Sequence, residues 1–138
     1  MGPIIAIDPG RDKCGVAIVS REGTLWRKVI PRKDLEQIVE ACRQRWKDVA
    51  RIVIGDGTGS KEVFQELRDL GLAVELVDEY GTTEEARKLY WKENKRKGWR
   101  KLVPVSLQTP PEPYDDLVAV VLGQRYWLQL EMKVNGRD

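Results

Sequence analysis

Two short apolar runs near the start of the chain, residues 4–7 and 15–20, limit most strongly what the chain can fold into. Each has the length of a buried strand, and the turn residues Asp-Pro-Gly at 8–10 end the first one. Because the connection between the runs is short, we expect them to pair as an antiparallel hairpin. A third strand is predicted at 24–30, where apolar and polar residues partly alternate.

After this third strand, apolar residues at helical spacing alternate with compact apolar strand runs. Strands are predicted at 51–55 and 73–77, and helices at 33–46, from the Gly-rich turn 56–60 to about residue 70, from Thr82 onward, and at 115–130. Thr82 and Glu85 have the spacing of a capping box, and residues 95–113 are predicted to be an exposed loop. The order β-β-β-α-β-α-β-α-α predicts an α/β domain in which helices cover a mixed sheet.

The chain has 138 residues, which suits one domain over residues 1–138. It contains no histidine, which excludes Ser-His-Asp and Cys-His catalysis in their usual form and histidine-based zinc sites. Its two cysteines, Cys14 and Cys42, are too few for a structural zinc site or a disulfide-built secreted domain. With no signal peptide and no membrane span in the sequence, we expect a cytoplasmic protein.

Six basic residues lie close together between positions 92 and 101, and they make a slightly acidic chain basic overall, with a net charge of +2. They are Lys92, Lys95, Arg96, Lys97, Arg100 and Lys101. Such local asymmetry suits a phosphate-backbone partner. A solvated helix end followed by a loop would have the same composition.

Four carboxylates, Asp8, Glu79 and the pair Asp115–Asp116, stand at the ends of predicted elements. Each alone has a simple structural explanation, since Asp8 fits a turn, Glu79 a solvated loop and the pair a helix start. Ligands gather at the carboxyl ends of strands in open α/β sheets, so we expect these acids to meet at one edge. Hard oxygen ligands suit Mg²⁺ or Mn²⁺, and two such ions about 3.5–4 Å apart can drive phosphodiester hydrolysis.

Three short motifs, in this order and spacing, give the chain a family resemblance. They are residues 5–10 with 15–18, residues 77–79 with 82–86, and residues 115–119 with Gln124 and Tyr126. Together they resemble the YqgF/RuvX family, which belongs with the RuvC-like Holliday junction resolvases in the ribonuclease-H-like group. The resemblance spans nearly the whole chain, and it lacks the arginine that usually follows the second acid of the family.

The resemblance implies a ribonuclease-H-like three-layer fold with a mixed five-stranded sheet flanked by helices. It implies an endonuclease that uses Mg²⁺ or Mn²⁺, with Asp8, Glu79 and Asp115 as metal ligands and Asp116 as a further catalytic candidate. The substrate would be structured nucleic acid, either branched DNA or precursor 16S rRNA. A homodimer would suit the junction, since a junction has two strands to cut.

Two other functions are compatible with the sequence. A non-catalytic nucleic-acid-binding module would keep the fold and the basic run. An actin- or sugar-kinase-like ATPase would share the turn at 8–10, but such proteins need two related domains, for which the chain is too short. The Gly-rich stretch 55–61 would serve equally well as a plain strand-to-helix turn or as a backbone cradle for a phosphate. Asp56, within it, is a less favoured metal ligand.

Overall fold

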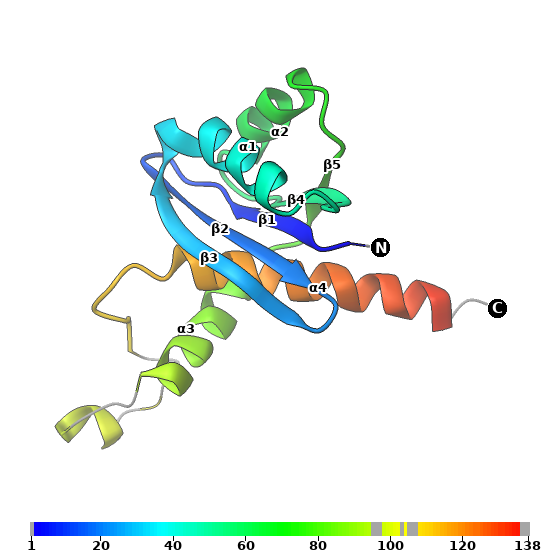
Figure 1. Ribbon diagram of the computed structural model, residues 1–138. Helices are drawn as coiled ribbons and strands as arrows, with labels where there is room; N and C mark the ends of the chain where they lie inside the picture. The colour runs from blue at the N-terminus through cyan, green and yellow to red at the C-terminus, as the bar shows by residue number, and fades with distance from the viewer. Residues whose placement is uncertain (1, 95–97, 103, 105–107, 136–138) are drawn as a thin grey trace.

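The computed structural model describes residues 2–94, 98–102, 104 and 108–135, and it has the predicted α/β architecture (Figure 1). The five strands are β1 (Ile4–Asp8), β2 (Lys13–Ser20), β3 (Gly23–Pro31), β4 (Arg51–Gly55) and β5 (Val74–Val77). They form one mixed sheet in the order β3-β2-β1-β4-β5. The leading hairpin is antiparallel, as is the β2–β3 pair, whereas β4 pairs in parallel with both β1 and β5.

Helices cover both faces of this sheet and make three layers (Figure 1). The α-helices are α1 (Leu35–Arg45), α2 (Ser60–Asp69), α3 (Thr82–Glu93) and α4 (Asp115–Asn135), and two short 3-10 helices are η1 (Arg32–Asp34) and η2 (Gly98–Leu102). One apolar cluster joins the sheet to α1 and α2, and a second joins its other face to α3 and α4. The predicted fold class is therefore confirmed, and the arrangement is compatible with a ribonuclease-H-like fold.

The alternation of side chains along β1 explains how one strand serves both layers. Ile4 and Ala6 belong to the cluster under α4, while Ile5 and Ile7 belong to the cluster under α1 and α2. All four side chains are fully buried. Successive residues of a strand point to opposite faces, so a central strand covered on both sides needs an unbroken apolar run.

The close packing of α4 across the sheet depends on two glycines. A Cβ atom at Gly123 would lie 2.7 Å from Cγ2 of Val19, and one at Gly15 would overlap the backbone carbonyl of Asp115. The indole N–H of Trp127 donates to the carbonyl of Val19 at 3.0 Å. These contacts hold α4 against β2 along most of the strand, and the last turns of α4 extend beyond the sheet (Figure 1).

Several predicted boundaries differ from the structure. The helix predicted at 33–46 begins as the 3-10 helix η1, and α4 continues to Asn135 instead of ending near residue 130. The capping box predicted for Thr82 and Glu85 was wrong. Gly81 is the N-cap residue of α3, with a left-handed backbone, and no side chain caps the helix start. The hydroxyl of Thr82 donates instead to the carbonyl of Glu79 at 2.8 Å.

The exposed loop predicted at 95–113 is only partly correct among its described residues. Gln108 and Pro110 are buried, and residues 98–102 form η2. Trp91 on α3 donates its indole N–H to the carbonyl of Gln108 at 3.2 Å, and Tyr90 donates to Glu112 at 2.8 Å. The segment that leads into α4 is therefore docked on α3.

Among the described residues, no helix has both the length and the apolar character needed to span a bilayer.

The contact between β2 and the start of α4 gives a first prediction. Gly15→Ala should lower the free energy of unfolding by about 1–3 kcal/mol, because the first turn of α4 must move away from the added methyl group. Urea denaturation measures this change. Thr24→Ala, an exposed position on β3, is the control and should change stability by less than about 0.5 kcal/mol. Equal effects of the two substitutions would show that the contact is not tight.

Candidate functional site

Asp8 and Asp115 meet because of the register of the leading hairpin. Asp8 is the last residue of β1 and pairs with Gly15 of β2. The backbone of Asp115 lies directly against Gly15, with no room for a side chain between them. The first turn of α4 is therefore placed beside the carboxyl end of the central strand, which is where α/β sheets hold their ligands.

Glu79 follows β5 and is held in place by the loop that follows β4. The amide N–H of Gly57 donates to Oε1 of Glu79 at 2.8 Å, and Asp56 accepts from the backbone N–H of Glu79 at 3.2 Å. A Cβ atom at Gly57 would overlap the Glu79 carboxylate. The Gly-rich turn after β4 thus binds a carboxylate of this chain, and the contact needs glycine.

The electrostatics of Asp8 show that the three acids act on one another. Burial, together with the negative charges of Asp115 and then Glu79, raises the pKa of Asp8 to about 7. Desolvation and like charges both disfavour an ionised carboxylate. Asp8 is thus the central acid of a group whose members come from three distant parts of the sequence.

Asp115 and Asp116 have different surroundings, although they are neighbours in sequence. Oδ2 of Asp115 lies 3.5 Å from Nζ of Lys13, on the side of Asp8. Asp116 contacts Nε of Arg27 at 3.1 Å and accepts from the amide of Leu117 at 2.9 Å. Burial raises the pKa of Asp116, and the Arg27 guanidinium opposes that shift. The structure therefore brings Asp115 to Asp8, whereas Asp116 contacts Arg27 of β3.

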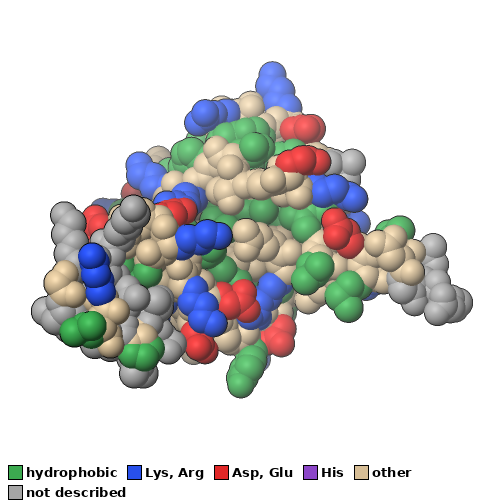
Figure 2. All heavy atoms as spheres, turned by 90° about the horizontal axis from the view of Figure 1, so that it is seen from below, with side chains coloured by type: hydrophobic (Ala, Val, Ile, Leu, Met, Phe, Trp, Pro, Cys, Tyr) green, Lys and Arg blue, Asp and Glu red, His purple; other side chains and the backbone are tan. Residues whose placement is uncertain are grey.

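Arg27 joins three elements near the site. Its guanidinium also binds both carboxylate oxygens of Glu93, at 3.0 and 2.8 Å. It therefore links the edge strand β3 to the end of α3 and to the start of α4. On the face that α3 and α4 form, the described acidic and basic side chains are interspersed (Figure 2).

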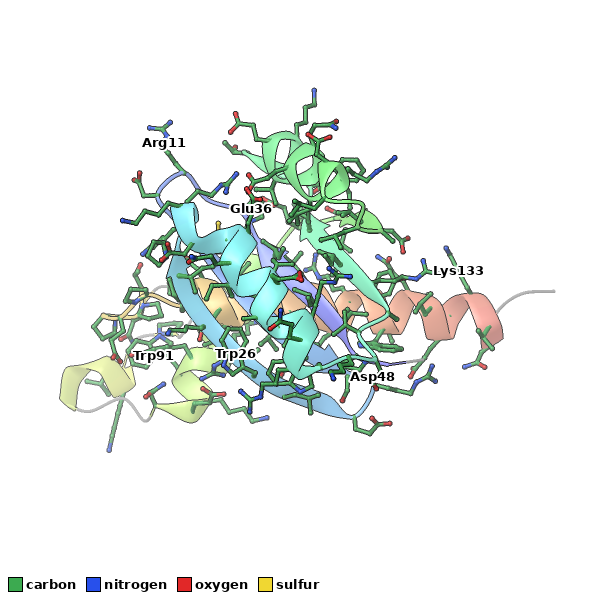
Figure 3. The ribbon with its side chains drawn as sticks, turned by 45° about the horizontal axis from the view of Figure 1, so that its top comes forward. Arg11, Trp26, Glu36, Asp48, Trp91 and Lys133 are labelled. Carbon is green, nitrogen blue, oxygen red and sulfur yellow. The ribbon has the colours of Figure 1, made fainter. Side chains whose placement is uncertain are left out.

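A surface hollow of about 550 Å³ lies beside Asp8 and Asp115, and the turn between β1 and β2 forms its rim. Arg11, at the tip of this turn, points away from the body of the protein (Figure 3). Lys13 lines the same hollow, and about half of its side chain is exposed. Lys13 is therefore the cation next to the acidic group, while Arg11 projects outward from the same turn.

The donor set suits a hard divalent cation in its chemistry, since it consists of carboxylate oxygens. Burial raises the pKa of Asp8 most, and the repulsion from Asp115 and Glu79 that adds to this shift is of the kind that such a cation offsets. However, among the described residues no three Asp, Glu or Cys side chains are arranged to hold a metal ion as they stand.

The predicted basic run is only partly described. Lys95, Arg96 and Lys97 lie outside the described residues, as does the side chain of Arg100. Lys92 at the end of α3 and Lys101 in η2 are exposed. The nucleic-acid-binding role predicted for these six residues stays a prediction.

Sequence reasoning missed the residues that contact the acids, namely Lys13 at Asp115, Arg27 at Asp116 and Gly57 at Glu79. Isolated basic residues in strands or helices carry no pattern that reveals their partners. The Gly-x-Gly pattern at 55–57 was a usable signal, because glycines after a strand permit close approach to the backbone.

The sequence matches no protein-family model, and no curated protein matches it significantly.

The raised pKa of Asp8 gives a second prediction. Since the folded-state pKa of about 7 lies above the ordinary value of 3.8, the folded state binds this proton more tightly than the unfolded state. The free energy of unfolding should therefore fall as pH rises from about 4 to about 7. Asp8→Asn removes this cost and should stabilise the metal-free protein at pH 8, by up to about 4 kcal/mol.

Denaturation of both proteins in chelator, at pH 5 and pH 8, measures this effect. The gain from Asp8→Asn should be clearly smaller at pH 5. Asp69→Asn, at the exposed end of α2, is the matched control and should show no such pH dependence. A loss of stability in Asp8→Asn at pH 8 would contradict the burial argument.

Proposed function

We propose that this protein is a metal-dependent endonuclease that hydrolyses phosphodiester bonds in structured nucleic acid. The observation that carries the proposal is that Asp8, at the carboxyl end of β1, is buried close enough to Asp115 and Glu79 for burial and their charges to raise its pKa to about 7. A group of mutually repelling carboxylates costs stability. Such a group is expected where a bound divalent cation neutralises its negative charge in the working protein.

The absence of histidine agrees with this chemistry. Mg²⁺ or Mn²⁺ bound by the three acids would supply an activated water and stabilise the leaving oxygen. Asp8 would have to lose its proton on binding, since metal ligands bind in the deprotonated form. Glu79 would use the oxygen that Gly57 does not bind, and Asp115 would exchange its contact with Lys13 for the metal.

Lys13 and Arg11 suit a polyanionic substrate, because both lie at the rim of the hollow that contains Asp8. Released from Asp115, Lys13 would be free to contact a phosphate. Phosphate contacts place a nucleic acid without reading its sequence. Recognition would then depend on the shape of the nucleic acid.

The resemblance to the YqgF/RuvX family supports two substrates within this proposal, a Holliday junction and precursor 16S rRNA. A homodimer would suit the junction and a monomer the rRNA. We place the protein in the cytoplasm, where thiols stay reduced, because Cys14 and Cys42 are both buried and free of disulfide bonds.

A second candidate is a nucleic-acid-binding module of the same fold without turnover. One observation favours it: the described residues contain no assembled metal ligand set. Incubation of the purified protein with branched DNA and precursor rRNA in Mg²⁺ or Mn²⁺ separates the two functions. Binding without cutting would support the module.

The endonuclease function gives a third prediction. Asp8→Asn should reduce cleavage by more than about 100-fold, because it removes a metal ligand, and even second-shell changes cost 10–100-fold. The measurement is cleavage of labelled junction and precursor rRNA in Mn²⁺, with Asp69→Asn as the control of matched chemistry. Full metal-dependent activity of Asp8→Asn would refute the assignment.

The different surroundings of the two neighbouring acids on α4 give a fourth prediction. Asp115→Asn should lose activity as severely as Asp8→Asn. Asp116→Asn should retain activity within about tenfold and change stability by less than about 1 kcal/mol, because relief of the burial cost offsets the lost Arg27 contact. Parallel cleavage assays and urea denaturation measure both effects. The reverse ranking of the two variants would make Asp116 the metal ligand.

A further inference from the structure

Arg125 binds the two ends of the segment that carries Glu79. Its Nη1 donates to the backbone carbonyl of Asp78 at 3.0 Å, and its Nη2 donates to Oε1 of Glu85 at 2.8 Å. Asp78 directly precedes Glu79, and Glu85 lies in the first turn of α3. The turn between them passes through Gly81, which has a left-handed backbone with φ of +74°.

The contacts of Arg125 contribute too little stability for that contribution to explain the arrangement. About half of the Glu85 side chain is exposed, and ion pairs of that kind contribute about 0–1 kcal/mol. A planar guanidinium that binds two acceptors at once instead defines a geometry. What it defines here is the position of the Glu79 segment relative to α4.

The same helix carries Asp115 in its first turn. Asp56 and Gly57 attach Glu79 to the end of β4, and Arg125 attaches the neighbouring backbone to α4. The distance between the Glu79 and Asp115 carboxylates therefore depends on both attachments. A rigid helix converts the Arg125 contact into a constraint at the acidic group.

We propose that Arg125 is a positioning residue, which holds the Glu79 segment against α4 so that Glu79 and Asp115 face Asp8 together. This inference rests on the proposed function, because it concerns the same acidic group. In this role Arg125 acts through the backbone of Asp78.

The test compares Arg125→Gln, Arg125→Lys and Glu85→Gln. Mn²⁺ binding is measured calorimetrically without substrate, and cleavage is then followed against Mn²⁺ concentration. Arg125→Gln should weaken Mn²⁺ binding by about 10–100-fold and raise the half-saturating Mn²⁺ concentration alike, with a smaller change in kcat at saturating metal. Arg125→Lys should lie between, since an ammonium group does not reproduce the planar fork. Glu85→Gln should change little, because the bond to Asp78 remains.

Arg21→Gln is the matched control. The Arg21 guanidinium stacks over the ring of Trp127 on α4, 5.2 Å from its centroid, and makes no contact with the Glu79 segment. It should leave Mn²⁺ affinity unchanged. Mn²⁺ affinity of Arg125→Gln within twofold of wild type, or an equal loss in Arg21→Gln, would overturn the positioning role.

The two proposals fail in different ways. A wild-type protein that binds Mn²⁺ no better than Asp8→Asn, and does not cut, would overturn the endonuclease and the role of Arg125 with it. A wild-type protein that binds Mn²⁺ and cuts, alongside an unaffected Arg125→Gln, would overturn only the positioning role. If Arg125→Gln does not fold, Arg125→Lys decides, because it keeps the charge and loses the double contact.

Discussion

The close approach of α4 to β2 is the constraint on which the rest of this structure depends. At Gly15 the backbone of the strand meets the backbone of the helix start, and at Gly123 the side chain of Val19 packs directly on the helix backbone. That contact buries one side of β2 and places Asp115 beside Asp8. A wider separation would preserve the layers of the fold but would separate the two acids. The packing of α4 on β2 therefore builds the core and positions Asp115 at the candidate site at the same time.

The acidic group lowers the stability of the fold, and the surrounding structure holds it in place. Asp8 is buried next to two other carboxylates, and its pKa rises to about 7 as a result. Cations are nearby, but they bind the outer members, Lys13 at Asp115 and Arg27 at Asp116. Fixed backbone groups, such as the amide of Gly57, hold Glu79. Unfavourable electrostatics of this kind, held by a rigid surrounding structure, are typical of functional sites.

The fold was largely predictable, because it follows from local patterns with a direct physical meaning. Unbroken apolar runs mark strands that are covered on both faces, and β1 and β4 are such strands. The errors fall at element ends, where several local solutions compete. Thr82 had the composition of a cap, yet Gly81 makes the turn into α3, and the hydroxyl of Thr82 finds a different carbonyl.

The sequence by itself determined the order of the elements and the placement of Asp8 and Glu79 at strand ends, because the period of apolar residues specifies strands and helices directly. Only the tertiary structure decided which of Asp115 and Asp116 joins Asp8, since the rotation of α4 on the sheet directs one carboxylate to Lys13 and the other to Arg27. The same holds for Arg125, whose acceptors lie 47 and 40 residues away along the chain. Contacts of that range arise from packing, and no local pattern encodes them.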